Sequence, residues 1–245
     1  MNIIRVQTAD STNRLLKELS SSNALEEGSA LIAETQTAGR GQKGASWEAA
    51  PGQNITCSLL LYPRFLSLKQ HFLLAKIIAL GVKETLDSLV PHLSSFSIKW
   101  PNDIYCENRK IAGILIENDL MQRQITRSIV GIGLNVNQET FTSDAPNPVS
   151  LRQLLGKSIG LDEVLETMLR RIMQWYQRLK DGQFEIISMA YHNALYHKTG
   201  FYKYEDKTGI FGAQIQSVSD DGFLNLMTDR GETRCYAFKE VSFVR

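Results

Sequence analysis

The chain has 245 residues, of which 43% are hydrophobic and 22% are charged, and 27 Lys and Arg against 26 Asp and Glu give a formal net charge of +1. This length can bury a sizeable core, and we expect one large and one small domain. The balanced charge argues against bulk electrostatic binding of nucleic acid, which relies on many Lys and Arg.

The cysteines and the N-terminus indicate the compartment. Cys57, Cys106 and Cys235 show no paired spacing, so we expect free thiols in a reducing cytoplasm. The N-terminus has no charged-then-apolar signal pattern, and the most apolar run, 72–82, is interrupted by Lys76 and is too short to span a bilayer. We therefore predict a cytoplasmic protein that does not enter the membrane.

A polar segment and a glycine-rich loop dominate the first fifty residues. Residues 10–13 (Asp-Ser-Thr-Asn) precede the periodic run 15–19, where a helix N-cap is the usual role of such residues. Residues 39–44 match G-x-G-x-x-G, the dinucleotide fingerprint, after a candidate strand at 30–35. However, residues 47–54 carry turn formers where that fingerprint needs a helix. A basic loop suited to a carboxylate or a phosphate remains, with a flexible surface turn as the alternative.

The middle of the chain predicts a sheet covered by a helix. Apolar residues recur every four positions from Leu74 to Val90 and stop at Pro91, which is typical of an amphipathic helix. The pattern also predicts strands at 55–62, 96–100, 111–117 and 128–137.

The segment Lys-Trp-Pro-Asn-Asp at 99–103 is the most informative in the chain. Pro101 cannot donate to a ladder, so the strand should stop there. A short strand at 104–106 and a polar tip then lead into a returning strand that contains Gly113. A solvated surface hairpin is the alternative, but cations, an amide and a carboxylate around the ends of buried strands suggest an anion site.

The last third predicts a change of architecture. Residues 140–148 form a polar loop, and a helix with apolar positions between Val164 and Tyr176 should end near Gly182. Past His197, short strands are broken by turns at 206–209, 220–222 and 229–231, as in a small β-barrel. We expect a first domain at 1–196 and a second at 197–245.

Several of these segments, in their order and spacing, resemble the catalytic domain of biotin protein ligases: 10–13, 36–41, Trp47, 99–103, 110–117 and 131–137. The resemblance implies an α+β fold of the class II synthetase-like, biotin/lipoate ligase type. Helices pack on a mixed β-sheet, and a small SH3-like β-barrel follows. Residues 3–6 lead almost directly into Asp10, which leaves no room for an N-terminal helix-turn-helix, so we expect a monofunctional ligase that does not bind DNA.

The resemblance also implies the chemistry. The carboxylate of biotin attacks the α-phosphate of ATP, pyrophosphate leaves, and a lysine of a biotin carboxyl carrier protein, from acetyl-CoA carboxylase or a related carboxylase, attacks the mixed anhydride. Mg²⁺ accompanies ATP. Both steps bring anions together, so nearby cations must offset the repulsion. Lys110 is the strongest candidate to bridge the carboxylate and the α-phosphate and then to stabilise the oxyanion.

The resemblance assigns three groups of site residues and no protein ligands to a metal. The catalytic group is Lys110, Arg40 and Asp103. The biotin-binding group is Ser11, Thr12, Asn13, Gln36, Arg40, Gly41, Gln42, Lys110 and Gly113. The ATP- and adenylate-binding group is Lys43, Trp47, Lys99, Asn102 and Asn135. Asp103 either holds a Mg²⁺-bound phosphate or helps to deprotonate the acceptor lysine.

One departure from the family and two alternatives accompany this assignment. Many members carry arginine where this chain has Gln42, so the adenylate should be held less tightly unless Lys43 compensates. A lipoate or octanoate ligase shares the fold type. A non-enzymatic biotin or nucleotide sensor leaves Lys110, Arg40 and Asn102 without a role. An exposed sheet edge could pair two copies into a homodimer.

Overall fold

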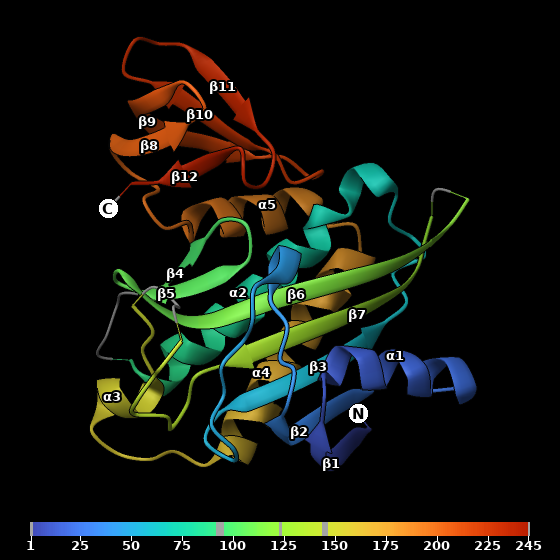
Figure 1. Cartoon of the computed structure of the whole chain (residues 1–245). Helices are drawn as coiled ribbons and strands as arrows, with labels where there is room; N and C mark the ends of the chain where they lie inside the picture. The colour runs from blue at the N-terminus through green and yellow to red at the C-terminus, as the bar shows by residue number, and fades with distance from the viewer. Residues whose placement is uncertain (1, 92–95, 123, 144–146, 245) are drawn as a thin grey trace.

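The computed structural model describes residues 2–91, 96–122, 124–143 and 147–244 (Figure 1). Its larger sheet has seven strands in the order β1-β2-β3-β7-β6-β5-β4. The first two strands are parallel and the other neighbours are antiparallel, which confirms the mixed sheet. The strands are β1 (Ile3–Ala9), β2 (Ala30–Gln36), β3 (Ile55–Leu61), β4 (Phe96–Lys99), β5 (Asp103–Cys106), β6 (Arg109–Met121) and β7 (Gln124–Leu134).

Helices cover both faces of this sheet. They are α1 (Thr12–Ser22), α2 (Phe72–Leu89), α3 (Leu151–Leu155), α4 (Leu161–Lys180) and α5 (Phe184–Asn193), with single 3₁₀ turns η1 (Gln42–Gly44) and η2 (Leu68–Gln70). In the described part of the chain, no helix has the length and apolar character needed to cross a membrane.

Strand β3 shows why the two faces need separate helices. All seven of its residues are buried. Leu60 packs with Leu16 of α1 on one face, whereas Leu59 and Leu61 belong to the larger core cluster beneath α2 and α4 on the other. Because successive strand residues point to opposite faces, a continuous apolar run marks a strand that is covered on both sides.

Helices α2 and α4 pack closely because of one glycine. A Cβ atom on Gly81 would lie 2.9 Å from the backbone N and Cα of Ile172, so a larger residue would force the two helices apart. Both helices were expected from their apolar periodicity, and the structure confirms them with ends within a few residues of the prediction.

Strands β6 and β7 are longer than predicted. The pattern indicated 111–117 and 128–137, whereas the structure forms a hairpin that reaches Met121 and begins its return at Gln124. Leu120 and Met121 near its tip are exposed. The polar residues of this extension gave no strand signal, because cross-strand pairing in the hairpin sustains the strands there.

The small C-terminal domain is a five-stranded antiparallel sheet in the order β11-β10-β9-β8-β12 (Figure 1). Its strands are β8 (Tyr202–Asp206), β9 (Gly209–Val218), β10 (Leu224–Thr228), β11 (Thr233–Tyr236) and β12 (Val241–Phe243). The predicted turns at 206–209, 220–222 and 229–231 are confirmed as connections between these strands. All five follow residue 197, where we propose the domain boundary.

A buried lysine joins the two domains. Lys76 of α2 is only 1% exposed, and its Nζ lies 2.7 Å from Oδ1 of Asp220 and 3.0 Å from Oγ of Ser188. Burial lowers the pKa of Lys76, and the Asp220 carboxylate opposes this shift. Trp100 Nε1 donates to the carbonyl of Gly222 at 3.0 Å, so the turn around Asp220 is anchored beside the end of β4.

Candidate active site

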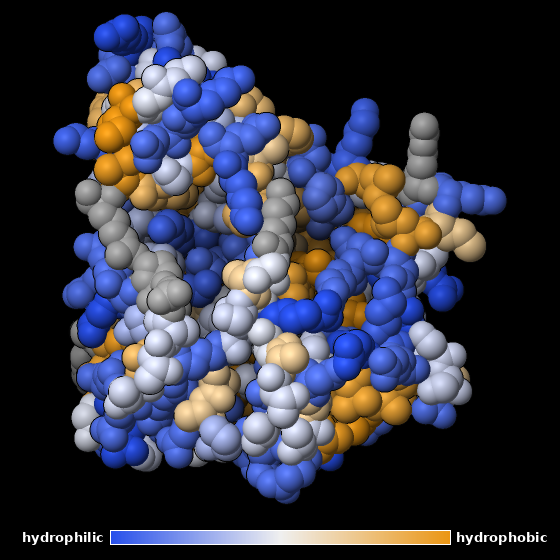
Figure 2. All heavy atoms as spheres, viewed as in Figure 1, coloured by the Kyte–Doolittle hydropathy of each residue, from blue (hydrophilic) through white to orange (hydrophobic). Residues whose placement is uncertain are grey.

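A cavity of about 630 Å³ lies between the larger sheet, the glycine-rich loop and the small domain. Figure 2 shows this side of the molecule hollowed beneath the small domain, with hydrophilic atoms inside the hollow. Of the predicted site residues whose side chains the structure describes, all except Asn135 line the cavity. The side chain of Lys43 lies outside the described part of the chain. The motifs scattered over residues 11–113 are therefore brought together.

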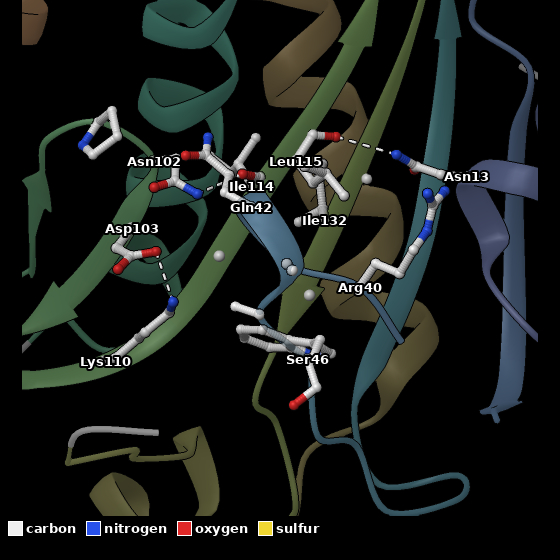
Figure 3. A pocket seen from close by; sticks show the side chains of 18 of the residues that line it. Asn13, Arg40, Gln42, Ser46, Asn102, Asp103, Lys110, Ile114, Leu115 and Ile132 are labelled. Carbon is white, nitrogen blue, oxygen red and sulfur yellow. Dashed lines mark hydrogen bonds and ion pairs between the residues drawn. The ribbon is translucent and has the colours of Figure 1, made fainter. Parts of the chain in front are cut away.

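Lys110 and Asp103 form a compact ion pair at one end of the cavity (Figure 3). Lys110 Nζ lies 2.7 Å from Asp103 Oδ1, and each side chain is 22% exposed. Asn102 fixes the turn before Asp103. Its side-chain Nδ2 donates to the backbone carbonyl of Ile114 at 2.8 Å, and its backbone carbonyl accepts from the Ile114 N–H at 2.9 Å. The carboxylate and the ammonium are thus held on neighbouring strands.

Glycines make the floor of the cavity beside this pair. Gly113 of β6 pairs with Gly133 of β7, and the indole of Trp47 lies on both. A Cβ atom on Gly113 would lie 2.9 Å from the Trp47 ring, and one on Gly133 would lie 2.2 Å from it. Lys110 Nζ is 5.6 Å from the Trp47 ring centroid. Only glycine at both positions leaves room for a flat aromatic group on the sheet.

The opposite end of the cavity is polar and uncharged at its base. The backbone N–H of Thr12 donates to Gln36 Oε1 at 2.9 Å, and the Thr12 hydroxyl oxygen lies 3.1 Å from the same atom. Asn13 is buried, and its Nδ2 donates to Glu117 Oε2 at 2.7 Å. Ser11 occupies the N-cap position of α1 without a side-chain capping bond. The N-cap predicted within residues 10–13 is therefore Ser11 by position, without a hydrogen bond from its hydroxyl to the helix.

The glycine-rich loop closes on itself above the sheet. Arg40 forms an isolated bridge with Ser46, and the Gly41 amide donates to the carbonyl of Ala45 at 2.6 Å. The 3₁₀ turn η1 inside this loop is not followed by a helix at 47–54, as the turn formers there predicted. Arg40 points toward Asn13 and pairs with Glu117 at 3.3 Å (Figure 3).

Two predicted nucleotide-binding residues lie in different surroundings. Lys99 lines the cavity, where its Nζ is 3.2 Å from the Tyr105 hydroxyl and 5.2 Å from the centroid of Phe243. Asn135 is 3% exposed and donates to the carbonyl of Val149 at 3.1 Å. The structure does not bring Asn135 to the cavity wall, and its contact with the nucleotide stays a prediction.

Sequence reasoning assigned no residue of the small domain to the site. Phe238, Lys239, Ser242 and Phe243 line the cavity, although they follow Lys110 by more than a hundred residues. No motif marks them, because their place depends on how the small domain docks.

Glu48, the neighbour of Trp47 in the chain, holds the loop after β7. Its carboxylate accepts from the amides of Thr142 and Ser143 at 2.9 and 2.8 Å. Burial opposes the shift, but these bonds lower the pKa of Glu48. The predicted polar loop at 140–148 is thereby fixed at its start, while residues 144–146 lie outside the described residues.

The site combines cations with an aromatic platform and an uncharged polar end. Such a site suits one ligand that has an anionic group and a neutral polar group, and a second ligand that is itself an anion. Within the described ranges, no group of three or more His, Cys, Asp or Glu side chains gathers as a metal site.

Comparison with known proteins identifies the family. Residues 4–135 match the biotin/lipoate A/B protein ligase family. The bifunctional ligase/repressor BirA of Bacillus subtilis is 28% identical over 241 residues, covering 96% of this chain and 72% of BirA. The biotin--[acetyl-CoA-carboxylase] ligase of Mycobacterium tuberculosis is 33% identical over 178 residues, covering 69% of this chain and 64% of the relative.

A solved structure extends the similarity to the whole chain. The biotin protein ligase from Aquifex aeolicus in complex with biotin and ATP has a TM-score of 0.82 and 28% identity, covering 100% of this chain and 99% of the other. Both the sheet that carries Lys110 and the small domain are thus shared. The chain belongs to the biotin/lipoate A/B protein ligase family.

Proposed function

We propose that this protein is a biotin protein ligase that forms biotinyl-5'-AMP and transfers biotin to a lysine of a carrier protein. The observation that carries the proposal is the Lys110–Asp103 pair, held at 2.7 Å beside a glycine floor in the cavity. The similar Aquifex aeolicus enzyme was solved with biotin and ATP. The biotin--[acetyl-CoA-carboxylase] ligases among the relatives support acetyl-CoA carboxylase as the source of the acceptor.

The first step joins two anions. A carboxylate oxygen of biotin attacks the α-phosphorus of ATP, the bond to the β-phosphate oxygen breaks, and pyrophosphate leaves with the electron pair. Lys110 lies between the two reactants and offsets their repulsion, while Asp103 keeps its ammonium oriented. A fixed cation in a site that excludes water stabilises the charge of the transition state more than solvent does.

The second step transfers the acyl group. The amine of the acceptor lysine attacks the carbonyl carbon of the anhydride, the carbon–oxygen bond to phosphate breaks, and AMP leaves. The amine loses its proton to Asp103 or to solvent as the amide forms. Lys110 stabilises the tetrahedral oxyanion, and Arg40 with the loop around Gly41 covers the intermediate against hydrolysis.

The wider setting is part of the same proposal. Mg²⁺ arrives with the phosphates of ATP, and Asp103, which lines the cavity, either holds a Mg²⁺-bound phosphate or helps to deprotonate the acceptor lysine. The partner is a biotin carboxyl carrier protein, with no DNA target, and two copies could pair through an open edge of the seven-stranded sheet. Three free cysteines, two of them buried, support a reducing cytoplasm.

Intact-mass analysis of an apo carrier domain tests the proposal. The domain is incubated with this protein, Mg-ATP and either biotin or lipoate. We expect an ATP-dependent gain of one biotinyl group, lost when the acceptor lysine is replaced by arginine. A gain with lipoate alone would move the protein to the lipoate branch of the family, and no gain with either acid would contradict ligase activity on this acceptor.

A further inference from the structure

A chain of short polar contacts runs behind the uncharged end of the cavity. It begins at Glu117 of β6, whose Oε2 accepts from Asn13 Nδ2 at 2.7 Å. Asn13 Oδ1 is 2.6 Å from Ser58 Oγ, which is 2.8 Å from Thr12 Oγ1. Thr12 then contacts Gln36 Oε1. Glu117 and Ser58 stand behind the residues that line the cavity, so they act on a ligand through their neighbours.

Glu117 determines which way the Asn13 amide faces. A carboxylate can only accept hydrogen bonds, so the group turned toward Glu117 must be the NH₂ of Asn13. The same Nδ2 also contacts the carbonyl of Leu115 at 3.3 Å, a second acceptor. With the NH₂ held there, Oδ1 must face Ser58 and take the single proton of its hydroxyl.

The side-chain orientation of Gln36, at the other end of this series of contacts, is fixed in the same way. The backbone N–H of Thr12 is always a donor, so the atom of Gln36 that faces it at 2.9 Å must be the carbonyl oxygen. The Gln36 amide nitrogen is therefore turned toward Gly39. Between two fixed ends, the hydroxyls of Ser58 and Thr12 retain little rotational choice, and the donors and acceptors that a ligand meets form one pattern.

The sheet holds Asn13 in place without specifying its orientation. A Cβ atom on Gly131 would lie 2.5 Å from Asn13 Oδ1, so Asn13 packs directly against the backbone of β7. Oxygen and nitrogen of an amide have similar size, and packing of this kind accepts either orientation. The distinction between them therefore rests on the acceptors that face Nδ2, the Glu117 carboxylate at 2.7 Å and, at the longer distance of 3.3 Å, the carbonyl of Leu115.

We propose that Glu117 is a positioning residue that sets the hydrogen-bond pattern of the biotin-binding end of the cavity. The inference rests on the proposed function, because a cyclic urea with two N–H donors and one carbonyl acceptor needs a fixed pattern of partners. Glu117 Oε2 also lies 3.3 Å from Arg40, so the same carboxylate ties the glycine-rich loop to this end.

The test measures equilibrium binding of biotin, without ATP, by calorimetry. Wild type should bind, and Glu117→Ala should bind about tenfold more weakly, because the buried Asn13 amide loses the nearer of its two acceptors and keeps only the longer contact with Leu115. Glu117→Gln keeps an oxygen that can face Asn13 and should lose less than threefold. Glu166→Gln, an exposed change on α4, is the matched control, and thermal melts show that each variant is folded.

A reciprocal exchange makes the test independent of simple loss of packing. Asn13→Asp places two carboxylates together and should abolish detectable biotin binding, whereas Asn13→Asp combined with Glu117→Gln restores a donor and an acceptor at this contact. The double variant should recover part of the lost affinity. A merely structural role for Glu117 gives no such recovery.

The outcomes separate the inference from the proposed function. Wild-type binding together with an unchanged Glu117→Ala would overturn the inference alone. A double variant no better than Asn13→Asp would also overturn it. A wild-type protein that binds no biotin would overturn the proposed function and the inference with it.

Discussion

Each end of the cavity has an ion pair at its wall or just behind it, but the two pairs differ in tightness. Lys110 and Asp103 are 2.7 Å apart and 22% exposed each, on strands joined by one hairpin. Arg40 and Glu117 are 3.3 Å apart with exposures of 47% and 35%, and Arg40 belongs to a glycine-rich loop. Exposed pairs of the second kind contribute below about 1 kcal/mol. The Lys110 end of the cavity is therefore preformed before a ligand binds, whereas at the other end Arg40 can separate from Glu117.

The largest expected effect comes from breaking the tight pair. Lys110→Ala should leave biotin binding largely intact while slowing adenylate formation by about 10³-fold, because the cation that offsets two converging anions is removed. Pyrophosphate release measures the first step and calorimetry measures binding. Lys157→Ala, an exposed change outside the cavity, serves as the control. Unchanged ligation by Lys110→Ala would show that the assignment of Lys110 is wrong.

A third ion pair, between Lys76 and Asp220 at the domain junction, can be compared with these two by its effect on stability. Asp220→Asn should lower the free energy of unfolding by about 2 kcal/mol, less than for a fully enclosed pair because Asp220 is 39% exposed. Lys76→Met removes the buried charge itself and should cost less. Urea denaturation compares the two variants, and a larger loss for Lys76→Met would contradict this view of the junction.

The glycine-rich loop that carries Arg40 offers a second position, Gln42, at which a charge can be added. Gln42→Arg places a further cation in the loop that lines the cavity, and we expect adenylate release about fivefold slower, a change of about 1 kcal/mol. Release is followed by trapping the labelled intermediate in the absence of acceptor. Gln42→Met is the neutral control. An equal off-rate in Gln42→Arg would indicate that the missing arginine does not limit retention.

The smallest expected effect concerns pH. His197 is stacked between Tyr196 and Tyr202, and burial, aided by the charge of Lys99, lowers its pKa to about 4. As pH falls from about 6.5 to 4, the unfolded chain takes up a proton that the folded chain refuses, so stability decreases. We expect His197→Asn, which tolerates the positive φ of this residue, to lose a few degrees less in Tm over this range. Parallel melting curves would contradict the assignment.

Much of the fold followed from local pattern. The continuous apolar run of β3, the four-residue periodicity of α2 and the turns of the small domain each reflect a rule that neighbouring residues satisfy by themselves. The first strand and the short helices α3 and α5 were not expected, because their sequences are brief and depend on packing. The extension of β6 and β7 to Met121 and Gln124 likewise depends on pairing between strands.

The site divides in the same way. The sequence alone, through its resemblance to biotin protein ligases, predicted that Lys110, Asp103, Arg40 and Asn13 share one site, and the structure places all four around one cavity. Only the tertiary structure decided that Lys239 and Ser242 reach the cavity and that Asn135 does not line it. It also placed Glu117 behind Asn13, 104 positions away along the chain. Hydrogen-bond direction and domain docking are relations between distant residues, so no local pattern records them.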